Sequence, residues 1–129
     1  MDEMQEHKCK ITGTRRRKSL PKDMRRKVYE IHDGHCAYCG KEIDIKDMQV
    51  DHIQSVYLGG VDEIANYRPA CRSCNFYKST MSIERLREEL GRIVGRLEKL
   101  FIFRLAIAYG LIEFTGKPIK FYFEGMDRQ

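Results

Sequence analysis

Four of the five cysteines in this chain of 129 residues form two C-x-x-C pairs, in which Cys36 is followed by Cys39 and Cys71 by Cys74. Four thiolates in this arrangement, with about thirty residues between the pairs, suit a tetrahedral zinc ion. Redox-active dithiols are the alternative, but the presence of two pairs and the lack of a thioredoxin-like context favour a metal. Because sulfur fills all four positions around such an ion, we expect a structural zinc that stabilises the fold.

The sequence predicts a reducing compartment. Its first six residues are polar and acidic and do not resemble a signal peptide, and no apolar run is long enough to span a bilayer. Cysteines in the cytoplasm stay reduced, so the two pairs are expected to bind metal instead of forming disulfides. We therefore predict a cytoplasmic protein, in which Cys9 is an incidental thiol of an N-terminal arm.

The charge of the chain favours an anionic partner. The formal net charge is +5 and the isoelectric point is about 9.0, which is typical of proteins that bind nucleic acid. A soluble protein that is merely basic is the alternative. The basic residues near the N-terminus are expected to contact phosphates, which fixes position without reading sequence; they are Arg15, Arg16, Arg17, Lys18, Arg25 and Arg26.

The apolar pattern predicts an α+β fold. Apolar residues at helical spacing predict a helix over 20–32 with Ser19 as its cap, and loose alternation predicts a strand over 47–53. A second helix is expected to begin at Cys74. A long amphipathic helix is expected from Ser82 to Gly110, weakened at Gly91 and Gly95, and then a β-hairpin formed by 112–114 and 119–123.

These elements divide the chain into three parts. Residues 1–18 are predicted to be a mobile basic arm, and residues 19–80 a core that contains both cysteine pairs. Residues 81–129 are predicted to be a C-terminal helix and hairpin that pack on this core. The apolar stripe of that helix is expected to be scaffold rather than a cofactor site.

The dipeptide Asp51-His52 lies between the two cysteine pairs. Neighbouring side chains on a strand point to opposite faces, so both can face one metal only where the strand bends or ends. Alone, such a dipeptide is usually an ordinary surface feature. Here it is accompanied by Gly59-Gly60, by Asn66, and by Asn75 directly after Cys74, which favours a functional site.

Together these residues resemble the HNH endonucleases, the ββα-metal nucleases. The resemblance covers about residues 35 to 80 and rests on the two cysteine pairs, Asp51-His52-Ile53, Gly59-Gly60, Asn66, Asn75 and Lys78. The whole chain is similar to small stand-alone members of phages and bacteria. The resemblance implies a ββα-metal core stapled by zinc and hydrolysis of phosphodiester bonds in double-stranded DNA, in a bacterial or phage-infected cell.

The resemblance also implies a role for each residue. His52 stands at the position of the general base that deprotonates water. Asp51 and Asn75 stand at ligand positions for one Mg²⁺ or Mn²⁺ ion, which binds the scissile phosphate and the leaving 3′ oxygen. Asn66 stands where the family's middle Asn braces the loop and helps to orient the base. The expected products carry 5′-phosphate and 3′-hydroxyl ends.

Two positions depart from the family's pattern. Ser55 stands where many relatives have Pro, so the loop is expected to be less rigid. Asn75 stands where many have His, so the expected metal affinity is weaker. Arg68, Arg72 and Lys78 are further candidates for phosphate contacts, with a solvated side chain as the alternative.

A metal-dependent DNA endonuclease is the leading hypothesis. A zinc-stabilised DNA-binding module or regulator without cleavage activity is the alternative, and a nuclease that has become an inhibitor of another protein is a third. The sequence leaves open the target site, cleavage of one or both strands, tolerance of RNA, and assembly into a homodimer or a larger phage or bacterial complex.

Overall fold

The computed structural model describes residues 19–126, so Cys9 and the four basic residues Arg15 to Lys18 lie outside the described part of the chain. Its centre is an antiparallel pair of short strands, β1 (Gln49–His52) and β2 (Tyr67–Ala70). In this ladder Asp51 lies opposite Arg68, and His52 lies opposite Tyr67. The mixed α+β architecture predicted from the sequence is confirmed.

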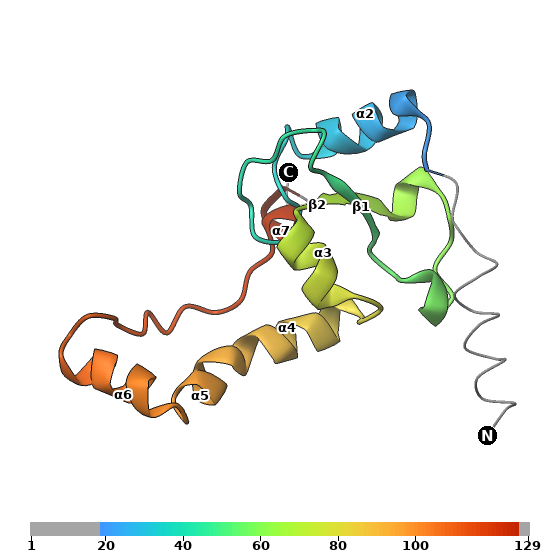
Figure 1. Cartoon of the computed structure of the whole chain (residues 1–129). Coiled ribbons are helices and arrows are strands. Elements are labelled where there is room, and N and C mark those ends of the chain that lie inside the picture. The colour runs from blue at the N-terminus through green and yellow to red at the C-terminus, as the bar shows by residue number, and fades with distance from the viewer. Residues whose placement is uncertain (1–18, 127–129) are drawn as a thin grey trace, which may run out of the picture.

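Helix α2 (Lys22–Ile31) covers one side of the sheet (Figure 1). Its buried residue Val28 packs with Met48 and Tyr67, which form a small apolar cluster. The helix begins two residues later than predicted. Pro21 takes the N-cap position without a side-chain hydrogen bond, so Ser19 is not the cap.

The loop between the strands contains two short 3-10 turns, η1 (Val56–Leu58) and η2 (Ile64–Asn66). Ser55 caps η1, and its hydroxyl donates to the carbonyl of Thr80 at 3.1 Å, which ties the loop to the chain after the third helix. Gly60 lies so close to its neighbours that a Cβ atom there would be 1.8 Å from the carbonyl oxygen of Gln54. The turn therefore requires glycine at this position.

Helix α3 (Arg72–Lys78) follows β2 directly and completes a ββα unit. It begins earlier than predicted, because Cys71 takes the N-cap position and its sulfur accepts a hydrogen bond from the backbone N–H of Cys74 at 3.4 Å. The helix runs beside β1 (Figure 1). The end of β1 that carries Asp51 and His52 thus lies beside α3.

The single long helix predicted from Ser82 is wrong. Ser82 does cap a helix, but the chain forms three short ones, α4 (Ile83–Gly91), α5 (Ile93–Leu97) and α6 (Phe101–Ala108). The first break follows Gly91, where glycine has low helix propensity. The second break lies at Leu100, whose extended backbone (φ −84°, ψ 127°) separates α5 from α6.

The predicted C-terminal β-hairpin is also wrong. Residues 112–121 form neither helix nor strand, and the short helix α7 (Tyr122–Met126) follows them. The backbone N–H groups of Tyr122 and Phe123 donate to the carbonyls of Tyr38 and Ala37 instead of to a hairpin partner. Phe121 is buried in the core cluster around the cysteine pairs, so contact with the core replaces strand pairing.

Helices α5 and α6 and residues 111–118 form an arm that leaves the core and returns to it at α7 (Figure 1). No residue between Leu90 and Lys120 is buried, and large apolar side chains such as Phe101 and Tyr109 are mostly exposed. Within the part of the chain that the structure describes, no helix has the length and apolar character needed to cross a membrane.

Candidate functional site

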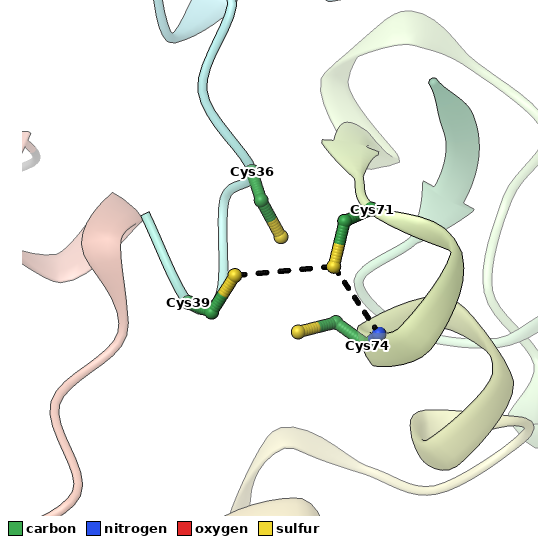
Figure 2. Close-up of side chains that lie close together, drawn as sticks. All are labelled: Cys36, Cys39, Cys71 and Cys74. Atoms are coloured by element: carbon green, nitrogen blue, oxygen red, sulfur yellow. Dashed lines mark hydrogen bonds between the residues drawn. The ribbon is translucent and has the colours of Figure 1, made fainter. Parts of the chain in front are cut away.

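The four cysteines of the two C-x-x-C pairs meet at one point. Their sulfur atoms all lie within 4.8 Å of one another, and the sulfurs of Cys39 and Cys71 are 3.9 Å apart (Figure 2). Around a tetrahedral zinc with Zn–S bonds of about 2.3 Å, neighbouring sulfurs would be roughly 3.8 Å apart. The cluster could therefore hold a zinc ion.

Two turns present these sulfur atoms. The first pair lies in the turn that ends at Gly40, whose φ of +78° is in the left-handed region that favours glycine. The second pair spans the start of α3, with Cys71 at the N-cap position. Backbone N–H groups of Tyr38 and Cys74 donate to the sulfurs of Cys36 and Cys71, both at 3.4 Å. Such contacts favour thiolates.

The cluster has an uneven electrostatic environment. A hydrogen bond from Cys74 lowers the pKa of Cys36 to about 4, and the same interaction raises the pKa of Cys74. Burial raises the pKa of Cys39. Several thiolates crowded together repel one another, and a divalent cation between them would relieve this repulsion.

A separate cleft lies between β1, the loop and α3. It has a volume of about 470 Å³, and Asp51, His52 and Asn75 all line it. Asp51 and His52 are neighbours on a strand and would normally face opposite sides. Both nevertheless line the same cleft, which lies at the end of β1.

Asp51 is a buried carboxylate with basic and polar partners. Its Oδ2 atom accepts a hydrogen bond from the hydroxyl of Tyr38 and lies 3.1 Å from Lys78 Nζ. Burial raises the pKa of Asp51, and the hydrogen bond from Tyr38 and the charge of Lys78 oppose this shift. Both contacts use Oδ2, so Oδ1 remains as an acceptor for a further cation.

The structure does not place Lys78 where a phosphate could reach it. Its side chain is fully buried, and Nζ donates to the backbone carbonyl of His52 at 2.8 Å in addition to its contact with Asp51. The phosphate contact expected for Lys78 is therefore corrected: this lysine neutralises Asp51 and holds the end of β1.

The imidazole of His52 is only 12% exposed, and Nε2 lies 2.8 Å from Oδ1 of Asp62. The hydroxyl of Tyr67 donates to the same oxygen at 2.6 Å. The Tyr67 ring also meets the imidazole edge to face, with 5.1 Å between the ring centroids. His52 thus has a carboxylate partner that the sequence reasoning did not identify.

Asn66 fastens the loop between the strands. Its side-chain amide donates to the carbonyls of Gln54 and Val61, both at 2.8 Å, and its Oδ1 accepts from the N–H of Gln54 at 3.0 Å. Its backbone carbonyl accepts from Ile53, the residue after His52. Asn66 therefore holds both the loop and the end of β1, and it does not line the cleft.

The expected phosphate contacts fall into two groups among the described residues. Arg26 and Arg72 are exposed and available to a ligand. Arg25 donates instead to the carbonyls of Ile45 and Met48, at 2.9 and 3.0 Å, so its expected phosphate contact is corrected to a structural one. Arg68 is half-buried and donates to the carbonyl of Tyr67 at 2.7 Å.

The sequence did not lead us to predict two residues that contribute to the site, Tyr38 and Asp62. Tyr38 lies inside the first C-x-x-C pair, and burial raises its pKa strongly, so it remains a neutral donor to Asp51. Its position between two clustered cysteines was the available signal. Asp62 follows Gly59-Gly60 at a short distance, and no local pattern indicates that it would reach His52.

Comparisons with known proteins were made for families, solved structures and curated sequences. The family model described as HNH endonuclease matches this segment. Among solved structures, the chain is similar to the Type II-C Cas9 enzyme from Actinomyces naeslundii, with 23% identity and a TM-score of 0.49. The similarity covers 70% of this chain and 9% of the Cas9 chain. No curated protein matches the sequence.

Proposed function

We propose, from the match of residues 36–80 to the HNH endonuclease family model, that the chain is a divalent-metal-dependent endonuclease that hydrolyses DNA. The observation that carries the proposal is the shared cleft of about 470 Å³, which Asp51, His52 and Asn75 line together. A module that only binds DNA has no need for a carboxylate, an imidazole and an amide in one cavity.

His52 is the general base of the proposed reaction. It takes a proton from a water molecule, whose oxygen then forms a bond to phosphorus. The bond between phosphorus and the 3′ oxygen breaks, its electron pair stays on that oxygen, and a proton from solvent completes the 3′-hydroxyl product. The 5′-phosphate remains on the other fragment. A neutral imidazole is suited to this step because one of its ring nitrogens carries a free electron pair.

Asp51 and Asn75 are the residues that would hold a Mg²⁺ or Mn²⁺ ion. Oxygen ligands of this kind suit both ions, and the Oδ1 atom of Asp51 makes no polar contact with the described residues. Burial raises the pKa of Asp51, and a bound cation would favour its charged form. A bound ion would offset the negative charge that develops on the phosphate and the leaving oxygen.

The four-cysteine cluster would contribute stability rather than chemistry. Sulfur would fill every position around a zinc ion, so substrate would have no access to it. The ion would join the turn before β1 to the start of α3. This connection holds Asn75, which follows Cys74 in α3, against the strand that carries Asp51 and His52.

The substrate proposed for this cleft is double-stranded DNA. The net charge of +5 favours an anionic partner, and the exposed side chains of Arg26 and Arg72 are available for phosphates. A chain with one site of this kind makes one cut at a time. We therefore propose that a single chain nicks one strand and that a homodimer or two encounters are needed to cut both.

Cleavage of supercoiled plasmid with Mg²⁺ or Mn²⁺ tests the proposal. Wild type should convert supercoiled to open-circular DNA, and His52→Ala should reduce the rate by at least about a hundredfold because general-base catalysis is lost. Asp51→Asn should raise the metal concentration needed for cleavage, because it removes a charged ligand of the ion. Salt-dependent DNA binding without nicking in either metal would refute the nuclease and favour the zinc-stabilised binding module.

A further inference from the structure

The imidazole of His52 is held by two residues outside the proposed metal site. Asp62 Oδ1 lies 2.8 Å from Nε2 of His52 and accepts a hydrogen bond from the Tyr67 hydroxyl at 2.6 Å. The Tyr67 ring stands at 89° to the imidazole, with 5.1 Å between the centroids. Tyr67 therefore contacts both members of the pair and connects them.

The fold places this pair through the sheet and the loop. Tyr67 is buried and lies directly opposite His52 in the β1–β2 ladder. The loop that carries Asp62 is fixed on one side by the close approach of Gly60 to Gln54, and on the other by the side chain of Asn66. Asp62 thus reaches His52 at a defined position although its own side chain is 75% exposed.

The contact decides which nitrogen of His52 can act as a base. A carboxylate has only acceptors, so the atom of His52 that faces it must carry a hydrogen. That atom is Nε2. In a neutral imidazole the other nitrogen, Nδ1, then holds the free electron pair.

Asp62 can play this part without competing for substrate. The cleft is lined by His52, Asp51 and Asn75, and Asp62 does not belong to its lining. The carboxylate therefore binds the imidazole from outside the cleft. This is the arrangement of a base oriented by a third group, as in other catalytic dyads and triads.

We propose that Asp62 is the positioning residue of His52, whose carboxylate accepts the Nε2 hydrogen and leaves Nδ1 as the nitrogen that takes the proton from water. This inference rests on the proposed nuclease function. Asp62 itself touches neither substrate nor metal. It keeps the imidazole of His52 in one tautomer and one ring orientation. Without it, only part of the His52 side chains would be in the reactive form, and the rate would be lower.

Nitrogen NMR of histidine-labelled protein tests the tautomer directly and without reference to activity. At a pH where the imidazole is neutral, the His52 signals, assigned by their loss in His52→Ala, should be those of the Nε2–H form. Asp62→Ala should shift them toward a mixture of tautomers. Asp62→Asn should retain the wild-type signals, because the amide oxygen can still accept from Nε2 and Tyr67. Glu63→Gln, at the neighbouring exposed carboxylate, should change nothing.

Plasmid cleavage supplies the second measurement. Asp62→Ala should lower kcat by roughly ten- to a hundredfold with little change in KM, and Asp62→Asn should recover most of that loss. A wild-type Nδ1–H tautomer, or an Asp62→Ala protein that keeps both tautomer and kcat, would overturn the inference. An Nε2–H tautomer in a protein that does not cleave DNA would refute the nuclease function and leave the assignment of Asp62 standing.

Discussion

The ammonium group of Lys78 lies 3.1 Å from the carboxylate of Asp51, and its side chain is fully buried at the end of α3. Lys78 also donates to the backbone carbonyl of His52 at 2.8 Å. A single buried cation therefore neutralises the proposed metal ligand and fixes the strand end that carries the proposed base. This arrangement couples the stability of the fold to the geometry of the cleft.

Replacing Lys78 with Met is expected to destabilise the protein by about 3 to 5 kcal/mol, because it leaves Asp51 buried without its ion-pair partner. Urea denaturation in metal-free buffer measures this free energy of unfolding. The double variant Lys78→Met with Asp51→Asn should lose less stability than Lys78→Met alone, since no unpaired charge remains. Equal losses in the single and double variants would show that the ion pair is not the cause.

Loss of one cysteine of the cluster is expected to abolish zinc binding. Cys39→Ser removes one of four ligands, so the protein should contain far less than one zinc per chain and should melt at a lower temperature, because metal binding contributes to folding. Metal analysis and thermal unfolding provide the measurements. Cys9→Ser is the matched control and should retain the metal; loss of zinc in this variant instead would contradict the four-cysteine assignment.

The cluster could be predicted because its information is local. A C-x-x-C pair is a turn with two thiolates, and few chemistries other than zinc binding use two such pairs. Asp51 and His52 were singled out by their place between the pairs. Asp62 could not be identified in this way, because its distance from His52 depends on the loop conformation that Gly60 and Asn66 set. Likewise, nothing local distinguishes the buried Lys78 from a solvated one.

The C-terminal part was harder to predict for a different reason. The apolar residues from Ile119 to Phe123 suit a strand, but their pattern does not identify the backbone that will pair with them. In the folded chain the carbonyls of Ala37 and Tyr38, in the turn of the first cysteine pair, accept these hydrogen bonds. Competition between a local hairpin and a distant turn is decided by tertiary packing, which overrides strand propensity.

Two glycines should respond to the same substitution in opposite directions. Gly60→Ala would place a Cβ atom 1.8 Å from the Gln54 carbonyl oxygen, so the loop must shift, at a cost of about 1 to 3 kcal/mol. Gly95→Ala in α5 meets nothing within 4 Å and should stabilise the protein by about 0.5 to 1 kcal/mol. Urea denaturation compares the two. A tolerated Gly60→Ala would contradict the close approach in the loop.

Stability in acid should depend on Glu89, which lies between Arg85, Arg92 and Arg96 at 3.0, 3.0 and 2.6 Å. The hydrogen bond from Arg96 and the charges of all three arginines hold the pKa of Glu89 below its ordinary value of 4.5. A lowered folded-state pKa contributes stability above the unfolded-state value, and this contribution is lost as the pH falls through the folded-state pKa. Glu89→Gln should therefore melt at a lower temperature than wild type near neutral pH, and the difference should shrink below about pH 4.5.

Glu88→Gln is the control, because its contact with Arg85 is long, at 3.8 Å, and exposed. Both variants keep the cysteine cluster, so loss of metal in acid affects them equally. A difference in melting temperature between Glu89→Gln and wild type that stayed constant with pH would contradict the assignment.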